Sequence, residues 1–233
     1  MDAYHAEQEQ IEALKRWWKE NATFVITGLV IGALAVFGWR AWQAHEIERA
    51  AAASLTYERL WDAVERGDRE QAEALGRTLR EDYAATPYAV HGALALAGTA
   101  VTAGDLDRAL AELEWALDHV DDPALAPLIR LRHARVLLAR NEPQAALDTL
   151  AAGGDAGRFA PLHDEVRGDA WLALGKVAEA RAAYQRALEA LASDASAIPD
   201  ADAGLIRMKL EDLPPAVEQA TPAQAAAGTE PAR

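Results

Sequence analysis

Residues 104–109 read Gly-Asp-Leu-Asp-Arg-Ala, and this short segment decides the fold because three other segments of the chain repeat its pattern. Each segment opens with Gly or Asn, residues that tolerate the left-handed backbone at the end of a helix, and has alanine five positions later. The opening residues are 37, 37 and 34 positions apart, namely Gly67, Gly104, Asn141 and Gly175. The chain therefore repeats a turn at a nearly constant interval.

A period near 34 residues with a helix on each side of a turn is typical of tetratricopeptide repeats. Seven positions before the turn, three units carry a small residue, whereas the first carries Leu60, so we interpret that unit as degenerate. No strand-like alternation persists, so we predict an all-α fold: one membrane helix followed by a tetratricopeptide-repeat-like α-solenoid. The helices that we predict cover residues 44–66, 68–83, 88–102, 105–120, 125–139, 143–151, 160–174, 177–191 and 201–212.

An uncharged run over residues 21–39 predicts a membrane anchor. At about 1.5 Å per residue, a helix of this length can cross a hydrocarbon core of about 30 Å. Tryptophans flank it on both sides, at Trp17, Trp18, Trp39 and Trp42, as membrane interfaces favour. Since no proline or glycine lies between Trp39 and Arg66, the same helix is expected to continue into the first repeat.

A cleaved signal peptide is the alternative to an anchor, since residues 33–35 have the small-x-small form of a cleavage site. The run stays apolar through Val36 and Phe37, and its N-terminal flank is long and acidic, so we favour an uncleaved anchor. The predicted divisions are a cytoplasmic tail at 1–20, an anchor at 21–42, a periplasmic repeat domain at 43–213 and a disordered Ala/Pro-rich tail at 214–233.

Lys15, Arg16 and Lys19 crowd the N-terminal edge of the run, which favours a cytoplasmic N-terminus and an exported C-terminal domain. Over twenty residues on each side the positive charges balance, so charge alone leaves the orientation open. Gly28 and Gly32 form a GxxxG spacing that would let a second membrane helix approach closely. Glycine is also common in membrane helices without such a role.

The composition of the chain argues against several classes of function. The net charge of −14 argues against nucleic acid as a partner, because binding to phosphates needs clustered Lys and Arg. The chain has no cysteine, and its six histidines fall in no metal-ligating pattern, so we predict neither a metal nor another cofactor. No nucleophile or phosphate-binding motif occurs, and we therefore expect a binding protein and not an enzyme.

Repeat geometry predicts where a partner would bind. The first helix of each pair lines the concave side of such a solenoid, and a groove of leucines with a few charges suits a polypeptide segment. Several of these leucines could instead belong to the core, and periodicity does not separate the two. The candidate groove residues are His91, Leu94, Val101, Leu128, Leu131, Arg135, Leu138, Leu162, Glu165, Asp169 and Leu172.

Across about residues 2–213 the chain resembles the ancillary SecYEG translocon subunits, a YfgM-like family. The resemblance rests on the residues before the anchor, the Gly-rich run, the segments after it and two repeat cores. These segments are 9–21, 38–42, 52–57, 131–136, 167–170 and 208–210.

The resemblance implies an inner-membrane protein with a periplasmic repeat domain. It also implies association with the SecYEG channel and the periplasmic chaperone PpiD, and a role in helping exported polypeptides leave the translocon. Two alternatives stay open. One is an adaptor in another cell-envelope assembly complex; the other is a membrane-tethered regulator that acts through its cytoplasmic tail.

Overall fold

The computed structural model describes residues 2–193 and 202–214, and these residues form α-helices, one short 3-10 helix and no strand. This confirms the predicted all-α class. The predicted tail at 214–233 lies outside the described residues apart from Pro214. The helices are α1 (Asp2–Glu65), α2 (Arg69–Asp82), α3 (Pro87–Thr102), α4 (Leu106–His119), α5 (Ala126–Ala139), α6 (Pro143–Ala151), α7 (Ala160–Ala173), α8 (Val177–Ser193) and α9 (Ala203–Glu211).

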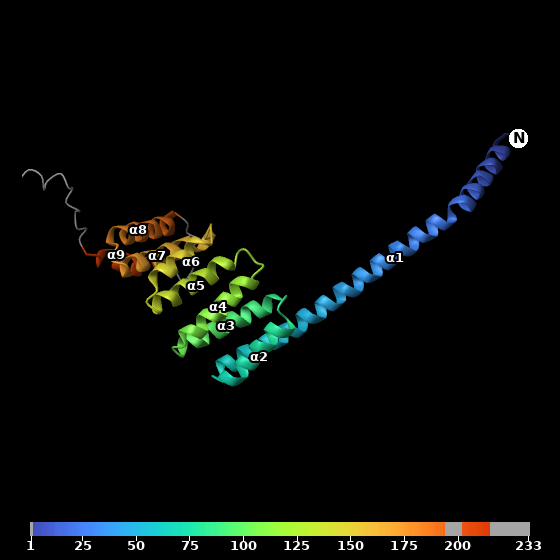
Figure 1. The fold of residues 1–233 in the computed structure, drawn as a ribbon. Helices are drawn as coiled ribbons and strands as arrows, with labels where there is room; N and C mark the ends of the chain where they lie inside the picture. Colours follow the sequence, from blue (N-terminus) through green and yellow to red (C-terminus); the bar gives the residue numbers. More distant parts are fainter. Residues whose placement is uncertain (1, 194–201, 215–233) are drawn as a thin grey trace, which may run out of the picture. The chain divides into compact units, whose positions relative to one another are not determined.

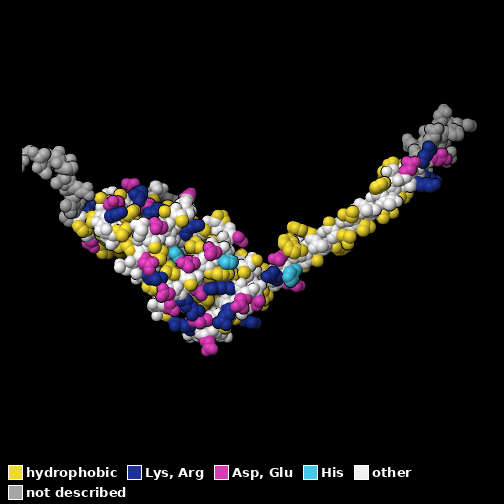
Figure 2. All heavy atoms as spheres, viewed as in Figure 1, with side chains coloured by type: hydrophobic (Ala, Val, Ile, Leu, Met, Phe, Trp, Pro, Cys, Tyr) yellow, Lys and Arg dark blue, Asp and Glu magenta, His cyan; other side chains and the backbone are white. Residues whose placement is uncertain are grey.

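The chain divides into two compact units, Met1–Leu55 and Thr56–Arg233. The first unit consists of α1 up to Leu55, and side chains 26–45 of that helix are all exposed. An 18-residue window of it reaches a mean hydropathy of 2.0 with 0% of its surface buried, so it is long and apolar enough to cross a membrane. Hydrophobic side chains cover this helix in Figure 2. A core helix of a soluble protein would instead bury them.

Paired tryptophans stand near each end of the apolar segment. The rings of Trp17 and Trp18 are 6.4 Å apart, and those of Trp39 and Trp42 are 5.1 Å apart. Trp18 and Trp39 are 21 residues apart in one helix, which spans roughly 30 Å at about 1.5 Å per residue. That length matches the hydrocarbon core of a bilayer, with indole rings at both interfaces.

The second unit stacks helical pairs in chain order, as Figure 1 shows for α2 to α8. One core cluster of buried side chains joins α3, α4, α5, α6 and α7. A second cluster joins α8 to α9 around Tyr184 and Ile206, so α9 closes the far end of the stack. A 3-10 turn at Gly157–Phe159, which the sequence analysis did not predict, leads into α7.

The four repeated turns share one geometry. Gly67, Gly104, Asn141 and Gly175 all have a left-handed backbone, with φ between 62° and 76°. In each turn the amide of this residue bonds to a carbonyl three positions back, and the next amide bonds to a carbonyl five positions back. The last carbonyls of each first helix are thereby satisfied, and the chain reverses in two residues. The sequence prediction for these turns is confirmed.

Facing positions of the helical pairs carry one small and one large residue. The alanines five positions after each turn are all buried, with at most 1% of their surface exposed. One helical turn beyond these alanines, the second helix of three units carries a large residue. The facing position of the first helix, seven residues before the turn, carries a small one. The equivalent positions are Ala97 and Leu113, Ala134 and Leu150, and Gly168 and Tyr184, and an ideal Cβ on Gly168 would lie 2.3 Å from the Tyr184 ring.

The first unit reverses this order. Leu60 is fully buried, and an ideal Cβ on Gly76 would lie 3.5 Å from the Cδ1 of Leu60 and 2.3 Å from the Cδ1 of Leu96. Gly76 occupies the position that Leu113 and Tyr184 hold in the other units. The first unit thus departs from the other three, with the large residue on its first helix and the small one on its second, and the closest neighbour of Gly76 is Leu96 of the next pair.

Candidate binding groove

A groove of about 1110 Å³ lies in the repeat domain between the first helices of three consecutive pairs. Its walls come from α3, α5 and the last turns of α1, with contributions from the starts of α2 and α4. This is the side that repeat geometry predicts for binding. The groove is long enough for several side chains of a partner.

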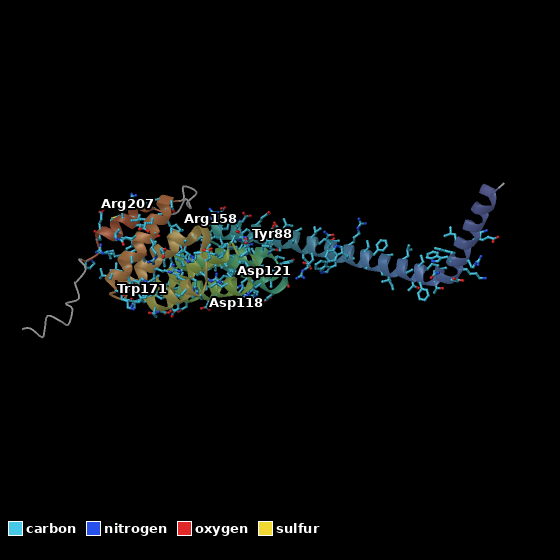
Figure 3. The ribbon with its side chains drawn as sticks, turned by 90° about the horizontal axis from the view of Figure 1, so that it is seen from above. Tyr88, Asp118, Asp121, Arg158, Trp171 and Arg207 are labelled. Atoms are coloured by element: carbon cyan, nitrogen blue, oxygen red, sulfur yellow. The ribbon has the colours of Figure 1, made fainter. Side chains whose placement is uncertain are left out.

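One end of the groove is aromatic. Tyr57 and Trp61, one turn apart on α1, line it, and their rings are 6.5 Å apart. The Tyr57 ring also lies 6.1 Å from Tyr88 and 6.0 Å from His91, both on α3; Tyr88 is labelled in Figure 3. Burial raises the pKa of the Tyr57 hydroxyl above its ordinary value, so this side chain stays neutral. Trp61 is 46% exposed and Tyr57 is half-buried, and Trp and Tyr side chains are the usual anchors of protein interfaces.

The groove walls are apolar in the middle and basic at the edge. Val101 of α3 is 45% exposed, and Leu128 of α5 is partly buried. Three arginines line the groove, Arg69, Arg132 and Arg135, against a single carboxylate, that of Asp68. Asp68 is engaged locally, because its carboxylate accepts the amide of Gln71 at 3.1 Å and caps α2.

Five of the eleven candidate residues line this groove: His91, Leu94, Val101, Leu128 and Arg135. Tyr57, Trp61 and Arg132 line it too and were missed. Trp61 follows Tyr57 by one helical turn, and Arg132 follows Leu128 by one turn, so helical spacing would have found them.

Leu131 and Leu162 do not line the groove. Their exposed surfaces are 0% and 2%, and both belong to the core cluster, so the prediction that they form a binding surface is wrong. Leu138 is half-buried against the same cluster. On α5 the residues at 128, 132, 135 and 139 face the groove, and Leu131 stands one position off this stripe. One residue turns a helix by about 100°, which moves a side chain from the groove to the core.

Glu165 and Asp169 of α7 do not line the groove, and both are contacted by the chain's own closing helix. The Nζ of Lys209, on α9, lies 2.8 Å from the Glu165 carboxylate and 2.8 Å from that of Asp169. Tyr184 donates its hydroxyl to Asp169 at 2.7 Å. Burial lowers the pKa of Lys209, but its hydrogen bonds to Asp169 and Glu165 outweigh burial and leave that pKa raised. Leu172, one turn further on, is 38% exposed outside the groove.

His163 of α7 is buried, with only 2% of its surface exposed. Its Nε2 donates to the carbonyl of Pro127 at 2.9 Å, which ties α7 to the start of α5. Burial lowers the pKa of His163, so the ring is neutral at pH 7. Among the side chains that the structure describes, those of residues 12, 14–193 and 202–214, no three His, Asp or Glu lie close enough together to hold a metal ion.

Gly28 and Gly32 lie in the exposed stretch of α1, and no neighbouring atom would come within 4 Å of a Cβ added at either glycine. Their surface is free to receive another helix. The contact itself stays a prediction.

Residues 15–215 match the family model of a tetratricopeptide repeat-like domain. The chain is 32% identical over 216 residues to an ancillary SecYEG translocon subunit of Escherichia coli strain K12, covering 91% of this chain and 99% of the relative. It is 34% identical over 149 residues to the Haemophilus influenzae protein of that name, covering 64% of this chain and 72% of the relative. A Neisseria gonorrhoeae relative is 28% identical over 214 residues, covering 91% and 100%. No solved structure matches the chain.

Proposed function

The chain belongs to the family of ancillary SecYEG translocon subunits with a tetratricopeptide repeat-like domain, and from this membership we propose that it is a membrane-anchored adaptor that binds polypeptides at the channel. The observation that carries the proposal is the groove of about 1110 Å³ on a chain whose N-terminal helix can cross a membrane. The anchor holds the groove near the channel, which raises its effective concentration around emerging chains. No bond is made or broken, and the work of the protein is positioning.

We further propose that the groove contacts exported polypeptides or PpiD. The protein would then hand those polypeptides over outside the inner membrane. The aromatic end of the groove and its apolar walls support polypeptide binding. Lys15, Arg16 and Lys19 beside the anchor support a cytoplasmic N-terminus.

Site-specific photocrosslinking in intact cells tests the groove. A photoreactive residue is placed at Val101 or Leu128, and the control position is Asp118 of α4, which is exposed, lies outside the groove and is labelled in Figure 3. We expect SecY, PpiD or exported polypeptides to be captured from the two groove positions and not from Asp118. Equal capture from all three positions would contradict a role for the groove.

The orientation can be tested because the chain has no cysteine. A cysteine introduced at Asp118 should react with a membrane-impermeant maleimide in spheroplasts without lysis. Labelling only after lysis would place the repeat domain in the cytoplasm and overturn the proposed hand-over.

The GxxxG face supports a second contact, between α1 and a membrane helix of the channel. Substituting leucine at Gly28 and Gly32 should reduce co-purification with SecY in mild detergent while the protein still inserts. The same substitution at Gly38, which is also open on all sides, is the control. An unchanged SecY yield from the double variant would remove this contact from the proposal.

A further inference from the structure

The charges that line the groove do not match those of the chain around it. The sequence has 37 acidic and 23 basic residues, yet three arginines and one aspartate line the groove. We infer that the groove binds an acidic amphipathic segment of a partner protein, with apolar side chains on one face and Asp or Glu beside them. This inference rests on the proposed function, because it specifies the chemistry of the polypeptide that the groove takes.

Two of the three arginines have no anionic partner. Among the described side chains, those of residues 12, 14–193 and 202–214, neither Arg69 nor Arg132 forms an ion pair, and both are exposed. Arg135 lies 3.6 Å from the Glu165 carboxylate, which Lys209 already contacts at 2.8 Å. The guanidinium groups therefore keep most of their donors for a bound carboxylate, and each can take one in a bidentate manner.

The carboxylates on α7, the next first helix in the stack, have a counter-ion within the chain. Glu165 and Asp169 on α7 receive a cation from within the chain, since Lys209 of α9 contacts both. The fold thus supplies a counter-ion for Glu165 and Asp169. It supplies none for Arg69 and Arg132. The missing charge is the one that a partner would bring.

Apolar side chains that line the same groove supply the anchor sites. Trp61 and Val101 are 46% and 45% exposed, and Leu128 lies on α5 one turn before Arg132. An apolar side chain seated here would place the neighbouring positions of its own segment beside the guanidinium groups. Apolar burial would give affinity, and the arginines would select acidic over basic segments.

The test uses the full chain in nanodiscs of zwitterionic lipid and two fluorescent amphipathic peptides. Both peptides carry leucine at helical spacing; one has glutamate and the other lysine at the flanking positions. We expect the glutamate peptide to bind at least tenfold more tightly, with an affinity that falls as salt rises. Equal binding of both peptides, or tighter binding of the lysine peptide, would overturn the inference.

Charge-reversal variants test whether the groove arginines cause the preference for the glutamate peptide. R69E/R132E breaks no ion pair and should reverse the preference toward the lysine peptide. The control R77E/R207E makes the same change of charge at two exposed arginines outside the groove and should leave the preference unchanged; Arg207 is labelled in Figure 3. An unchanged preference in R69E/R132E, with an unchanged helical circular dichroism spectrum, would also overturn the inference.

The two proposals fail differently. If the lysine peptide or an uncharged leucine peptide binds in the groove, and Leu128→Asp abolishes that binding, the acidic partner is wrong and polypeptide binding stands. If no peptide binds, and photocrosslinkers at Val101 and Leu128 capture no more than one at Asp118, both proposals fall.

Discussion

The first and last helical pairs of the repeat domain place their large and small facing residues on opposite helices. In the first pair the large residue, Leu60, is on the first helix, and the second helix carries Gly76, where an ideal Cβ would lie 3.5 Å from Leu60 and 2.3 Å from Leu96 of α3. In the last pair Gly168 is on the first helix, and an ideal Cβ there would lie 2.3 Å from the Tyr184 ring. The first end also carries the open aromatic part of the groove, whereas the last is closed by α9. What a repeat conserves is thus the filled volume between its helices, while its outer faces are free to differ.

Leu60→Ala should have the largest effect, because nothing on α2 can fill the space opposite Gly76. We expect a loss of about 2–5 kcal/mol in the free energy of unfolding, as for other buried leucines. Urea denaturation of the full chain in nanodiscs, followed by circular dichroism, measures it. Leu205→Ala removes a 40% exposed leucine and should change stability by less than about 0.5 kcal/mol. A comparable loss in both would mean that the first pair is not tightly packed.

Gly168→Ala should cost about 1–3 kcal/mol, because the added methyl group overlaps the Tyr184 ring. Combining it with Tyr184→Leu recreates the Ala134 and Leu150 arrangement and should recover part of the loss. Gly98→Ala, where nothing lies within 4 Å of the added methyl, should stabilise α3 by up to about 1 kcal/mol. If the double variant is no more stable than Gly168→Ala, the exchange of sizes between helices is not what matters.

Lys209→Met should loosen only the closed end. It leaves two carboxylates without their cation, but the Lys209 side chain is 26% exposed, so we expect about 1–2 kcal/mol and not the ~3–5 of a fully buried pair. Hydrogen exchange should become faster in α9 and stay unchanged in α3. The control is Arg207→Met on the same helix. Faster exchange throughout the domain would show that the two ends are not independent.

His163 should give a smaller, pH-dependent effect. Because burial lowers its pKa in the folded state, the unfolded chain binds more protons below the ordinary value of about 6.5. Stability is therefore full above that pH and falls as the pH drops toward the folded pKa. His163→Gln keeps a donor for Pro127 and removes the titration, so its melting temperature should change less between pH 7 and pH 5. The opposite order of slopes would mean that the ring is charged when buried.

The sequence was sufficient for features that depend on neighbours along the chain. The four turns need one left-handed residue each, and their Gly or Asn with a buried alanine five positions later predicted both geometry and phase. The ends of α2 to α7 fell within a residue or two of those expected. The uncharged run predicted the apolar helix for the same reason, since length and composition are local properties.

The candidate groove was predicted only in part, because its members depend on contacts between distant segments. Leu128 and Leu131 are equivalent by periodicity, and only the packing of α5 against α6 and α7 separates groove from core. Glu165 and Asp169 were expected to face a partner, but their counter-ion, Lys209, lies about 40 residues later in the chain. Trp61 was not predicted, because it lines the groove only through the packing of the end of α1 beside α3 and α5.

The exchanged sizes at the two ends bear on how the chain reaches its fold. Repeats of similar sequence risk pairing out of order, with the second helix of one unit docking on the first helix of another. Leu60 opposite Tyr184 would overfill the contact, and Gly168 opposite Gly76 would leave it hollow, so either mispairing carries a cost of about 1–5 kcal/mol. Side-chain volume therefore disfavours an exchange of helices between the first and last pairs, whereas the two middle pairs, which both carry alanine and leucine, are not distinguished in this way.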